Sequence, residues 1–333
     1  MILNLIYLLL KILAIIIPVL LAVAFLTYEE RKIISALQRR KGPNKVGLLG
    51  LLQPFADGLK LLTKETILKN GSASSFLFIL SPFSILVLSL LGWAVIPIGE
   101  YVCTLSNLQM GLLYILAITG SNIYSLILAG WSSNSIYSFL GCLRAAAQVI
   151  SYELAMGFVI LTIVVTAGSL NPMIIVLKQK SIWYCIPFFP LFLMFYIIIL
   201  AETNRHPFDL VEAESELVSG YNVEYSSMLF ACFFLAEYGS MLLMKALLII
   251  LFCGGWLPPL NIFPFNFIPG PIWFSLKLNF FIFLDILMRG ILPRLRYDQL
   301  MRLGWKIFLP FSFAFFVFIS TILFVTNGLP TFI

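Results

Sequence analysis

Residues 226 to 252, SSMLFACFFLAEYGSMLLMKALLIILF, form an apolar run long enough to cross a bilayer as an α-helix. The run contains two charged residues, Glu237 and Lys245. Burying a carboxylate at the centre of a membrane helix costs about 2.5 to 3.5 kcal/mol on insertion scales. Glu237 is therefore predicted to have a function, and proton handling is the first candidate.

Similar apolar runs recur on both sides of this stretch. The chain is 61% hydrophobic and 11% charged, whereas a soluble domain is about half apolar and about a quarter charged. These values predict an all-α polytopic membrane protein with about eight transmembrane helices. We place them, within a single integral membrane domain over residues 1–333, near 3–27, 76–98, 108–130, 145–170, 184–202, 226–252, 273–291 and 307–327.

Two further carboxylates belong to apolar segments, Glu153 in RAAAQVISYELAMG and Glu202 in LAETNRHPFDL. At 1.5 Å per residue, Glu237 is about 17 Å and Glu153 about 15 Å from the same face of the membrane. We expect a ladder of carboxylates from that face through Glu202 to the membrane centre, bridged by water. Hydrogen bonding between helices is the structural alternative.

An acidic cluster follows Glu202 in the connector 203–225. Crowding of like charges raises the pKa of some carboxyls toward neutrality, which suits a proton-collecting site. A solvated or subunit-binding acidic loop is the alternative. The cluster consists of Asp209, Glu212, Glu214, Glu216 and Glu224.

The predicted fourth helix carries Arg144, Gln148, Ser151 and Tyr152 on one face, because they follow each other at steps of four, three and one. Glu153 lies about 180° from Arg144 on this helix. We therefore expect Glu153 to find its partner on another helix.

The chain lacks the ligand spacings of metal and nucleotide sites. Its five cysteines, at 103, 142, 185, 232 and 253, stand singly, and His206 is the only histidine. Zinc, haem and iron–sulfur sites need several converging thiolate or imidazole ligands. The glycines at 42, 47 and 50 do not have the spacing of a phosphate loop. We predict no metal, nucleotide or nucleic-acid site in this chain.

The positive charges are distributed unevenly. Sixteen of the twenty-one Lys and Arg residues fall after predicted helices one, three, five and seven. By the positive-inside rule these connectors, including 28–75 and 203–225, face the cytoplasm or the mitochondrial matrix, and both termini face the other side. No presequence is expected before the first helix, which predicts synthesis inside the organelle. The asymmetry favours soluble partner subunits docking on one face, with topogenic charge and lipid contact as the alternative.

The connector 28–75 contains an amphipathic segment, 53–65. Phe55, Leu59 and Leu62 recur at helical spacing, and Asp57 and Lys60 lie on other faces. We expect an interfacial helix, which either frames a side entrance for a lipophilic substrate or anchors the surface.

Four blocks resemble a known family: ERKIISALQRRKGPNKVGLLGLLQPFADGLKLLTKE, RAAAQVISYE, AETNRHPFDLVEAESELVSGYNVEY and PRLRYDQLMRLGWKIFLP. They are similar to subunit 1 of the respiratory NADH:ubiquinone oxidoreductase (complex I). The resemblance implies a proton-pumping complex in the mitochondrial inner membrane, with bacterial plasma membrane as the alternative. It also implies ubiquinone as substrate, and FMN and iron–sulfur clusters on partner subunits rather than here. The implied partners are hydrophilic quinone-reducing subunits, small membrane subunits, antiporter-like subunits and membrane lipid.

The resemblance also implies residue roles. The quinone chamber would include Glu30, Arg31, Phe55, Asp57, Arg144, Tyr152, Arg205, Phe208 and Glu224. The acidic proton path would consist of Glu153, Glu202, Glu237, Asp209, Glu212, Glu214 and Glu216.

Two charges depart from the family pattern, Lys245 and Asp285. Asp285 stands four residues before Arg289, which predicts a salt bridge within one helix. Lys245 is expected to snorkel to the far surface. We predict that neither is catalytic.

Two other classes of protein suit some of these features. A secondary transporter also uses midplane carboxylates, but its usual internal repeat is not evident here. A hydrogenase-linked membrane subunit of the same ancestry would keep the acids and diverge in the quinone-entrance blocks.

Overall fold

The computed structural model describes residues 2–67, 74–100, 107–210, 220–259 and 265–328. Every regular element in those ranges is a helix. The longer elements are α1 (Ile2–Leu37), α2 (Gln53–Thr63), α3 (Ser75–Leu91), α4 (Gly111–Ser132), α5 (Ile136–Ala167), α7 (Phe189–Glu202), α9 (Ser227–Phe252), α10 (Gly270–Ile291) and α12 (Leu309–Val325). Shorter ones are α6 (Pro172–Lys178), α11 (Tyr297–Arg302) and the turn η3 (Gly220–Asn222).

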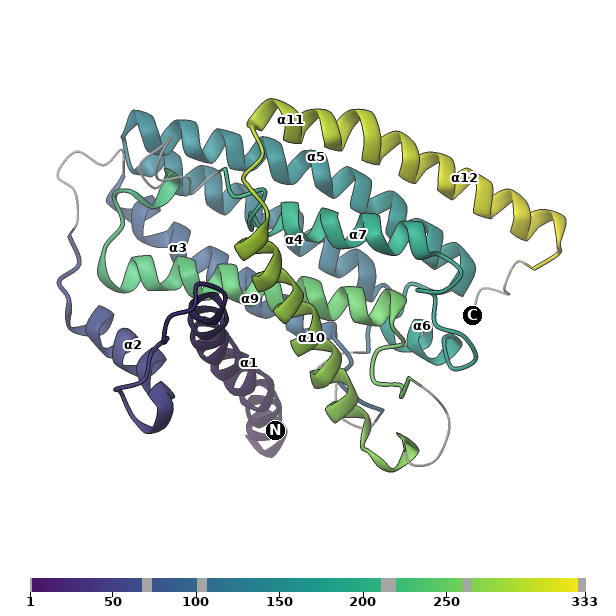
Figure 1. The fold of residues 1–333 in the computed structure, drawn as a ribbon, viewed down its shortest axis with the longest axis horizontal. Coiled ribbons are helices and arrows are strands. Elements are labelled where there is room, and N and C mark those ends of the chain that lie inside the picture. The colour runs from purple at the N-terminus through teal and green to yellow at the C-terminus, as the bar shows by residue number, and fades with distance from the viewer. Residues whose placement is uncertain (1, 68–73, 101–106, 211–219, 260–264, 329–333) are drawn as a thin grey trace.

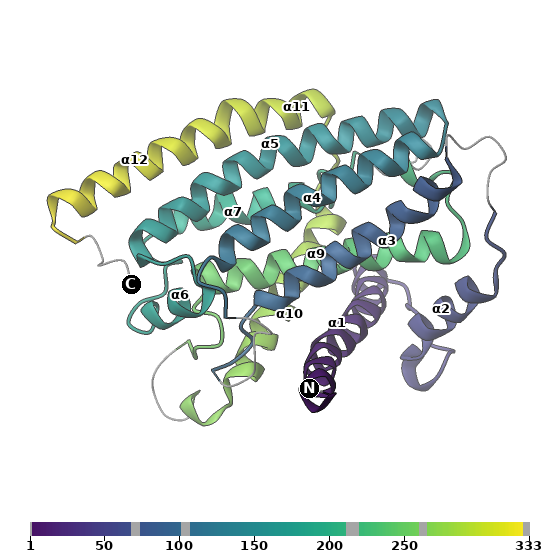
Figure 2. The same cartoon turned by 180° about the vertical axis from the view of Figure 1, so that it is seen from behind.

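Helix α9 is the centre of the bundle. All its residues from Met241 to Phe252 are buried, and it packs against α1, α2, α3, α6, α7 and α10. Helices α3, α4, α5 and α12 form an outer series in which each packs on its neighbour, α3 to α4, α4 to α5 and α5 to α12. Figures 1 and 2 show α1 and α10 crossing the other long helices steeply.

The prediction of an all-α polytopic membrane protein is confirmed. Among the described residues, seven helices are long and apolar enough to cross a membrane. Helix α7 is the eighth apolar helix and is shorter, with 14 residues. At 1.5 Å per residue it spans about 21 Å, and the segment before it adds length.

Two helices extend beyond the predicted bounds. Helix α1 continues past 27 to Leu37 because its charged turns find partners, so that Glu30 and Ser35 are buried. Helix α5 begins at Ile136 instead of 145, and Ser138, Gly141 and Cys142 are buried there. At α1 the charged turn ended our predicted span too early, since a paired charge does not stop a helix.

A glycine contact fixes the chain just before α9. A Cβ atom on Gly141 of α5 would lie 2.9 Å from the Cα atom of Gly220. Gly220 has a φ of +61°, a conformation that glycine adopts without a steric penalty. The close approach packs η3 directly on α5 and leads the chain into α9.

Candidate functional site: a buried charge network between two cavities

A buried carboxylate, Glu30 of α1, is the centre of a charged cluster. Its side chain accepts a hydrogen bond from the Tyr238 hydroxyl at 2.6 Å. Its other oxygen contacts Arg205 Nη1 at 3.2 Å and also Arg289 Nη1. The four groups come from α1, α9, α10 and the turn after α7, so the cluster forms only when these elements pack.

Arg205 also reaches a second carboxylate. Its Nε atom lies 3.4 Å from Oε1 of Glu237, and its guanidinium lies 4.2 Å from the centre of the Tyr238 ring. Burial disfavours its charge, but Glu237, Tyr238 and Glu30 outweigh burial and raise the pKa of Arg205 above its ordinary value. Arg205 is therefore a permanent cation shared by two carboxylates.

The position of Arg205 is set by the end of α7. The amide of Arg205 donates to the carbonyl of Leu200, which closes the turn after Glu202. Gln148 of α5 donates through Nε2 to the carbonyls of Ala201 at 2.8 Å and Phe208 at 3.1 Å. This buried amide holds both ends of the turn and thereby aims Arg205 at the cluster.

A cavity of about 740 Å³ opens beside Glu30. Ion pairing of Arg31 with Asp57, at 2.7 Å between Nη1 and Oδ2, ties α1 to α2 at its wall. The cavity has apolar walls from α1 and α9 and a polar end. Its lining includes Val23, Thr27, Glu30, Arg31, Asp57, Leu61, Phe230, Phe234, Tyr238 and Arg289.

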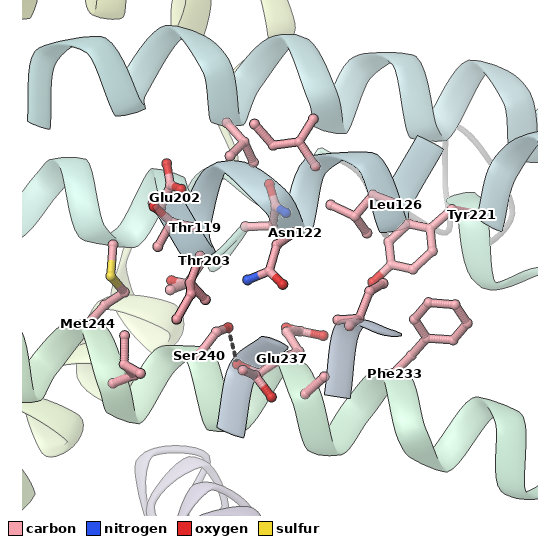
Figure 3. Close-up of a pocket in the computed structure, with 18 residues that line it drawn as sticks. Thr119, Asn122, Leu126, Glu202, Thr203, Tyr221, Phe233, Glu237, Ser240 and Met244 are labelled. Carbon is pink, nitrogen blue, oxygen red and sulfur yellow. Dashed lines mark hydrogen bonds between the residues drawn. The ribbon is translucent and has the colours of Figure 1, made fainter. Parts of the chain in front are cut away.

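A smaller cavity lies on the Glu237 side of the cluster, between α3, α4, α5, α9 and the end of α7. Figure 3 shows Glu202 and Glu237 on opposite sides of it, with the polar side chains of Thr119, Asn122 and Ser240 between them. Its volume is about 80 Å³, room for about two water molecules at roughly 30 Å³ each. Oε2 of Glu202 is buried without a hydrogen-bond partner among the described residues, which suits a water-bridged path.

Glu153 finds a partner on another helix, α4, as predicted. The Thr119 hydroxyl donates to its Oε1 at 3.4 Å, and Thr119 also lines the smaller cavity. On its other side Glu153 lines a more open cavity of about 380 Å³. Contacts thus run from Glu153 to Thr119 and from Glu237 through Arg205 to Glu30. The smaller cavity lies between these two sets and is lined by Thr119, Glu202 and Glu237.

Several predicted site residues lie outside these cavities. Tyr152 is fully buried and donates to the carbonyl of Leu300 at 2.9 Å, packed between Phe208 and Phe308. The Arg144 guanidinium lies 5.9 Å from the centre of the Tyr297 ring.

Some other predicted residues also lie outside the cavities, and three fall outside the described residues. Phe55 packs edge-on against Phe25 of α1, and Asp209 pairs with Arg294 at 3.3 Å. Glu224 lies between η3 and α9. Glu212, Glu214 and Glu216 fall in 211–219, outside the described residues.

The predicted surroundings of Lys245 and Asp285 are wrong. Lys245 is fully buried, and its Nζ lies 2.9 Å from Oδ1 of Asp285 in α10. The Tyr196 hydroxyl donates to the same oxygen at 2.7 Å, while Arg289 is turned to Glu30. Lys245 does not snorkel because α9 is buried from Met241 to Phe252 and a carboxylate is available on the adjacent helix.

Sequence reasoning missed several members of the site. Tyr238 adjoins Glu237 in the sequence but was not singled out, and Arg289 was assigned to Asp285. Thr119, Asn122 and Ser240 are polar residues within apolar spans, a pattern that could have found them. Over the described ranges, no group of three or more His, Cys, Asp or Glu side chains is arranged to hold a metal ion.

The bundle and its buried charges define a multi-pass α-helical membrane protein with a buried cluster of ion pairs. The model of the NADH dehydrogenase family matches residues 10–320. The chain belongs to this family, and the predicted resemblance to subunit 1 of complex I is confirmed.

Three relatives show the extent of the similarity. NADH-ubiquinone oxidoreductase chain 1 of Chondrus crispus is 57% identical over 97% of this chain and 98% of its own length. The protein of the same description from Arabidopsis thaliana is 55% identical over 96% and 98%. An NADH-quinone oxidoreductase subunit of the bacterium Rhodospirillum rubrum is 55% identical over 96% and 95%. Because the chain belongs to this family, the family assignment is preferred to the alternative of a secondary transporter.

Proposed function

We propose that this chain guides ubiquinone through the cavity between α1, α2 and α9 and couples its reduction to proton movement through the buried carboxylates. As a family member it is a membrane subunit of complex I, an oxidoreductase, and assembles with other subunits of that complex. The larger cavity is of a size and polarity that suit a lipophilic substrate with a polar headgroup, since apolar walls lead to Glu30, Arg31 and Arg289.

The observation that carries the proposal is the shared contact of Arg205. This one cation contacts Glu30, which lines the larger cavity, and Glu237, which lines the smaller one. A new negative charge in one cavity that attracts Arg205 therefore changes the electrostatic potential at the carboxylate in the other cavity.

The coupling follows from charge balance. A reduced, anionic quinone near Glu30 would compete with Glu30 and Glu237 for Arg205 and Arg289. Less neutralisation of Glu237 by Arg205 favours proton uptake in the smaller cavity. From there Glu202, Thr119 and Glu153 provide the onward steps, bridged by water.

The proposal also covers the partner subunits, the membrane and the orientation of the chain in it. Hydrophilic quinone-reducing subunits would dock on the side of the basic connectors and carry FMN and the iron–sulfur clusters. Small membrane subunits and antiporter-like subunits would continue the acidic path. The location would be the mitochondrial inner membrane, with both termini toward the intermembrane space and the basic connectors toward the matrix. The one-sided distribution of Lys and Arg supports this orientation.

Replacement of Glu202 tests the proposal. Glu202→Gln keeps the side-chain volume and removes titration, so we expect quinone-dependent NADH oxidation and proton pumping to fall about tenfold or more. The rate of NADH oxidation with an artificial acceptor measures the activity of the assembled soluble subunits and should be unchanged. The matched control is Glu100→Gln, an exposed carboxylate remote from the cavities, which should change neither rate.

Two results would count against the proposal. Normal pumping in an assembled Glu202→Gln complex would remove Glu202 from the path. Equal loss of the artificial-acceptor rate would mean that Glu202 acts in assembly instead.

A further inference from the structure

The end of α9 remote from Glu237 is held by an unusual set of side-chain contacts to carbonyls. Gln179 donates through Nε2 to Ile250 at 2.7 Å and to Leu251 at 3.2 Å. Lys277 of α10 donates to Cys253 at 2.7 Å and Gly255 at 2.9 Å. The last carbonyls of a helix lack partners within it. Gln179 supplies a partner to two of them, and Lys277 holds the turn that follows the helix.

Two cysteines meet at this helix end. The amide of Cys185 donates to the carbonyl of Phe252 at 2.9 Å, which brings Cys185 beside the next residue, Cys253. Both thiols are free. Cys253 is buried and Cys185 is partly exposed, so a small reagent meets Cys185 first.

Exposure favours reaction at Cys185. Thiol–disulfide exchange begins when a thiolate attacks a disulfide sulfur, and its rate depends on access. Cys185 is partly exposed, whereas Cys253 is buried, so the first attack falls to Cys185.

The other described cysteines lack such a partner. Cys142 lies within α5 and donates through Sγ to the carbonyl of Phe139 at 3.1 Å. Cys232 is buried within α9. They serve as internal controls for the pair.

We propose that Cys185 and Cys253 form a dithiol site that small apolar disulfides oxidise reversibly to an intramolecular disulfide. The Cys185 thiolate attacks the reagent, forms a mixed disulfide and releases one thiolate. That thiolate takes the proton of Cys253, and the Cys253 thiolate then attacks the Cys185 sulfur and releases the second thiolate. The protein loses two electrons and two protons, and the reagent disulfide becomes two thiols.

The bond would cross-link the segment before α7 to the end of α9. Glu202 is at the end of α7 remote from Cys185, and Glu237 is in the half of α9 remote from Cys253. The site is independent of the quinone role proposed above.

Peptide mapping of the native, detergent-solubilised complex tests the site. The complex is treated with dithiodipyridine, its remaining thiols are blocked with N-ethylmaleimide, and it is digested with trypsin. We expect the peptides 181–205 and 246–277 to be joined by a disulfide and to separate on reduction. Cys142 and Cys232 should take no part in a disulfide within the protein.

Several outcomes would overturn the proposal. They are persistence of both thiols in a maleimide-reactive form, a stable mixed disulfide at Cys185 alone, and a bond from either cysteine to Cys103. Each would show that the two sulfur atoms do not react with one another in the assembled protein.

A second reagent tests proximity without oxidation. Phenylarsine oxide binds two neighbouring thiols with loss of one water. We expect it to protect Cys185 and Cys253 from maleimide together, and a dithiol such as dimercaptopropanol to reverse the protection. Protection of one cysteine without the other would contradict the proposed pair.

Discussion

Helix α9 carries two buried charge clusters that differ in their surroundings. Around Glu237 and Tyr238, two arginines face two carboxylates and a cavity lies on either side. Around Lys245 one ammonium meets one carboxylate, Asp285, and the neighbouring residues of α9 are buried and apolar. Both clusters bridge α9 and α10. Cavities of about 740 Å³ and 80 Å³ adjoin the first cluster, whereas Asp285 of the second lines a space of about 10 Å³. In the first cluster Arg205 contacts two carboxylates and Glu30 contacts two arginines.

The comparison teaches that burial of charge alone does not identify a coupling site. In a closed apolar site, a single ion pair is costly to separate. In the first cluster Arg205 can shift between Glu30 and Glu237 without leaving Glu30 unaccompanied, because Arg289 also holds Glu30. The proposed coupling therefore concerns the first cluster, and the second is proposed to act in helix packing.

The largest expected effect comes from removing the shared cation. Arg205→Gln leaves Glu30 with Arg289 and leaves Glu237 without its arginine. We expect quinone-dependent NADH oxidation to fall by about tenfold or more, because the two cavities lose their electrostatic link. The measurement is the quinone-dependent rate per assembled complex, with the artificial-acceptor rate as the reference.

Arg205→Lys is the informative companion. It keeps the charge but loses the planar fork, so it should restore part of the rate and not all of it. Full activity in Arg205→Gln would break the comparison, since the two clusters would then be alike in function.

The second effect is on assembly rather than on rate. Lys245→Met leaves Asp285 buried without its cation, a change that costs about 3 to 5 kcal/mol for a buried pair. We expect less assembled complex on native gels and a near-normal quinone-dependent rate for each complex that assembles. The double variant Lys245→Met with Asp285→Leu removes both charges and should recover the amount of complex, a clear departure from additivity.

One result for the double variant would remove the distinction in function between the two clusters. If its complexes assemble normally and the quinone-dependent rate per complex is still lost, the Lys245 and Asp285 pair takes part in coupling.

The smallest effect is expected at the wall of the larger cavity. Arg31 and Asp57 form an exposed ion pair, and such pairs contribute about 0.2 to 1 kcal/mol. Asp57→Asn should raise the KM for a short-chain ubiquinone by no more than about fivefold and leave kcat unchanged. A drop in kcat with constant KM would place Asp57 among the coupling residues instead.

Much of the fold follows from the sequence, for an energetic reason. Apolar runs such as 226–252 must form helices in lipid, because each backbone group needs a partner within the segment. The predicted helix bounds failed at the end of α1, where charge is paired, and at the start of α5, where buried small and polar residues extend the helix. A carboxylate such as Glu30 does not end a helix when Tyr238 and Arg289 from other helices receive it.

The candidate site was partly predictable. Glu153, Glu202 and Glu237 stand out because a carboxylate in an apolar run is costly, and the structure brings them to the smaller cavity or its wall. Thr119 and Tyr238 carry weaker signals, because hydroxyl groups are tolerated in membrane helices without a special role.

The sequence by itself determined that the chain is a helical membrane protein and that carboxylates lie within its apolar spans. Both are local consequences of composition, since the cost of burial accrues residue by residue along the chain. The tertiary structure decided which cation meets which carboxylate. Asp285 pairs with Lys245 of α9, and Arg289 pairs with Glu30 of α1. Charge pairing depends on where helices cross, and the spacing of residues along one helix does not contain that information.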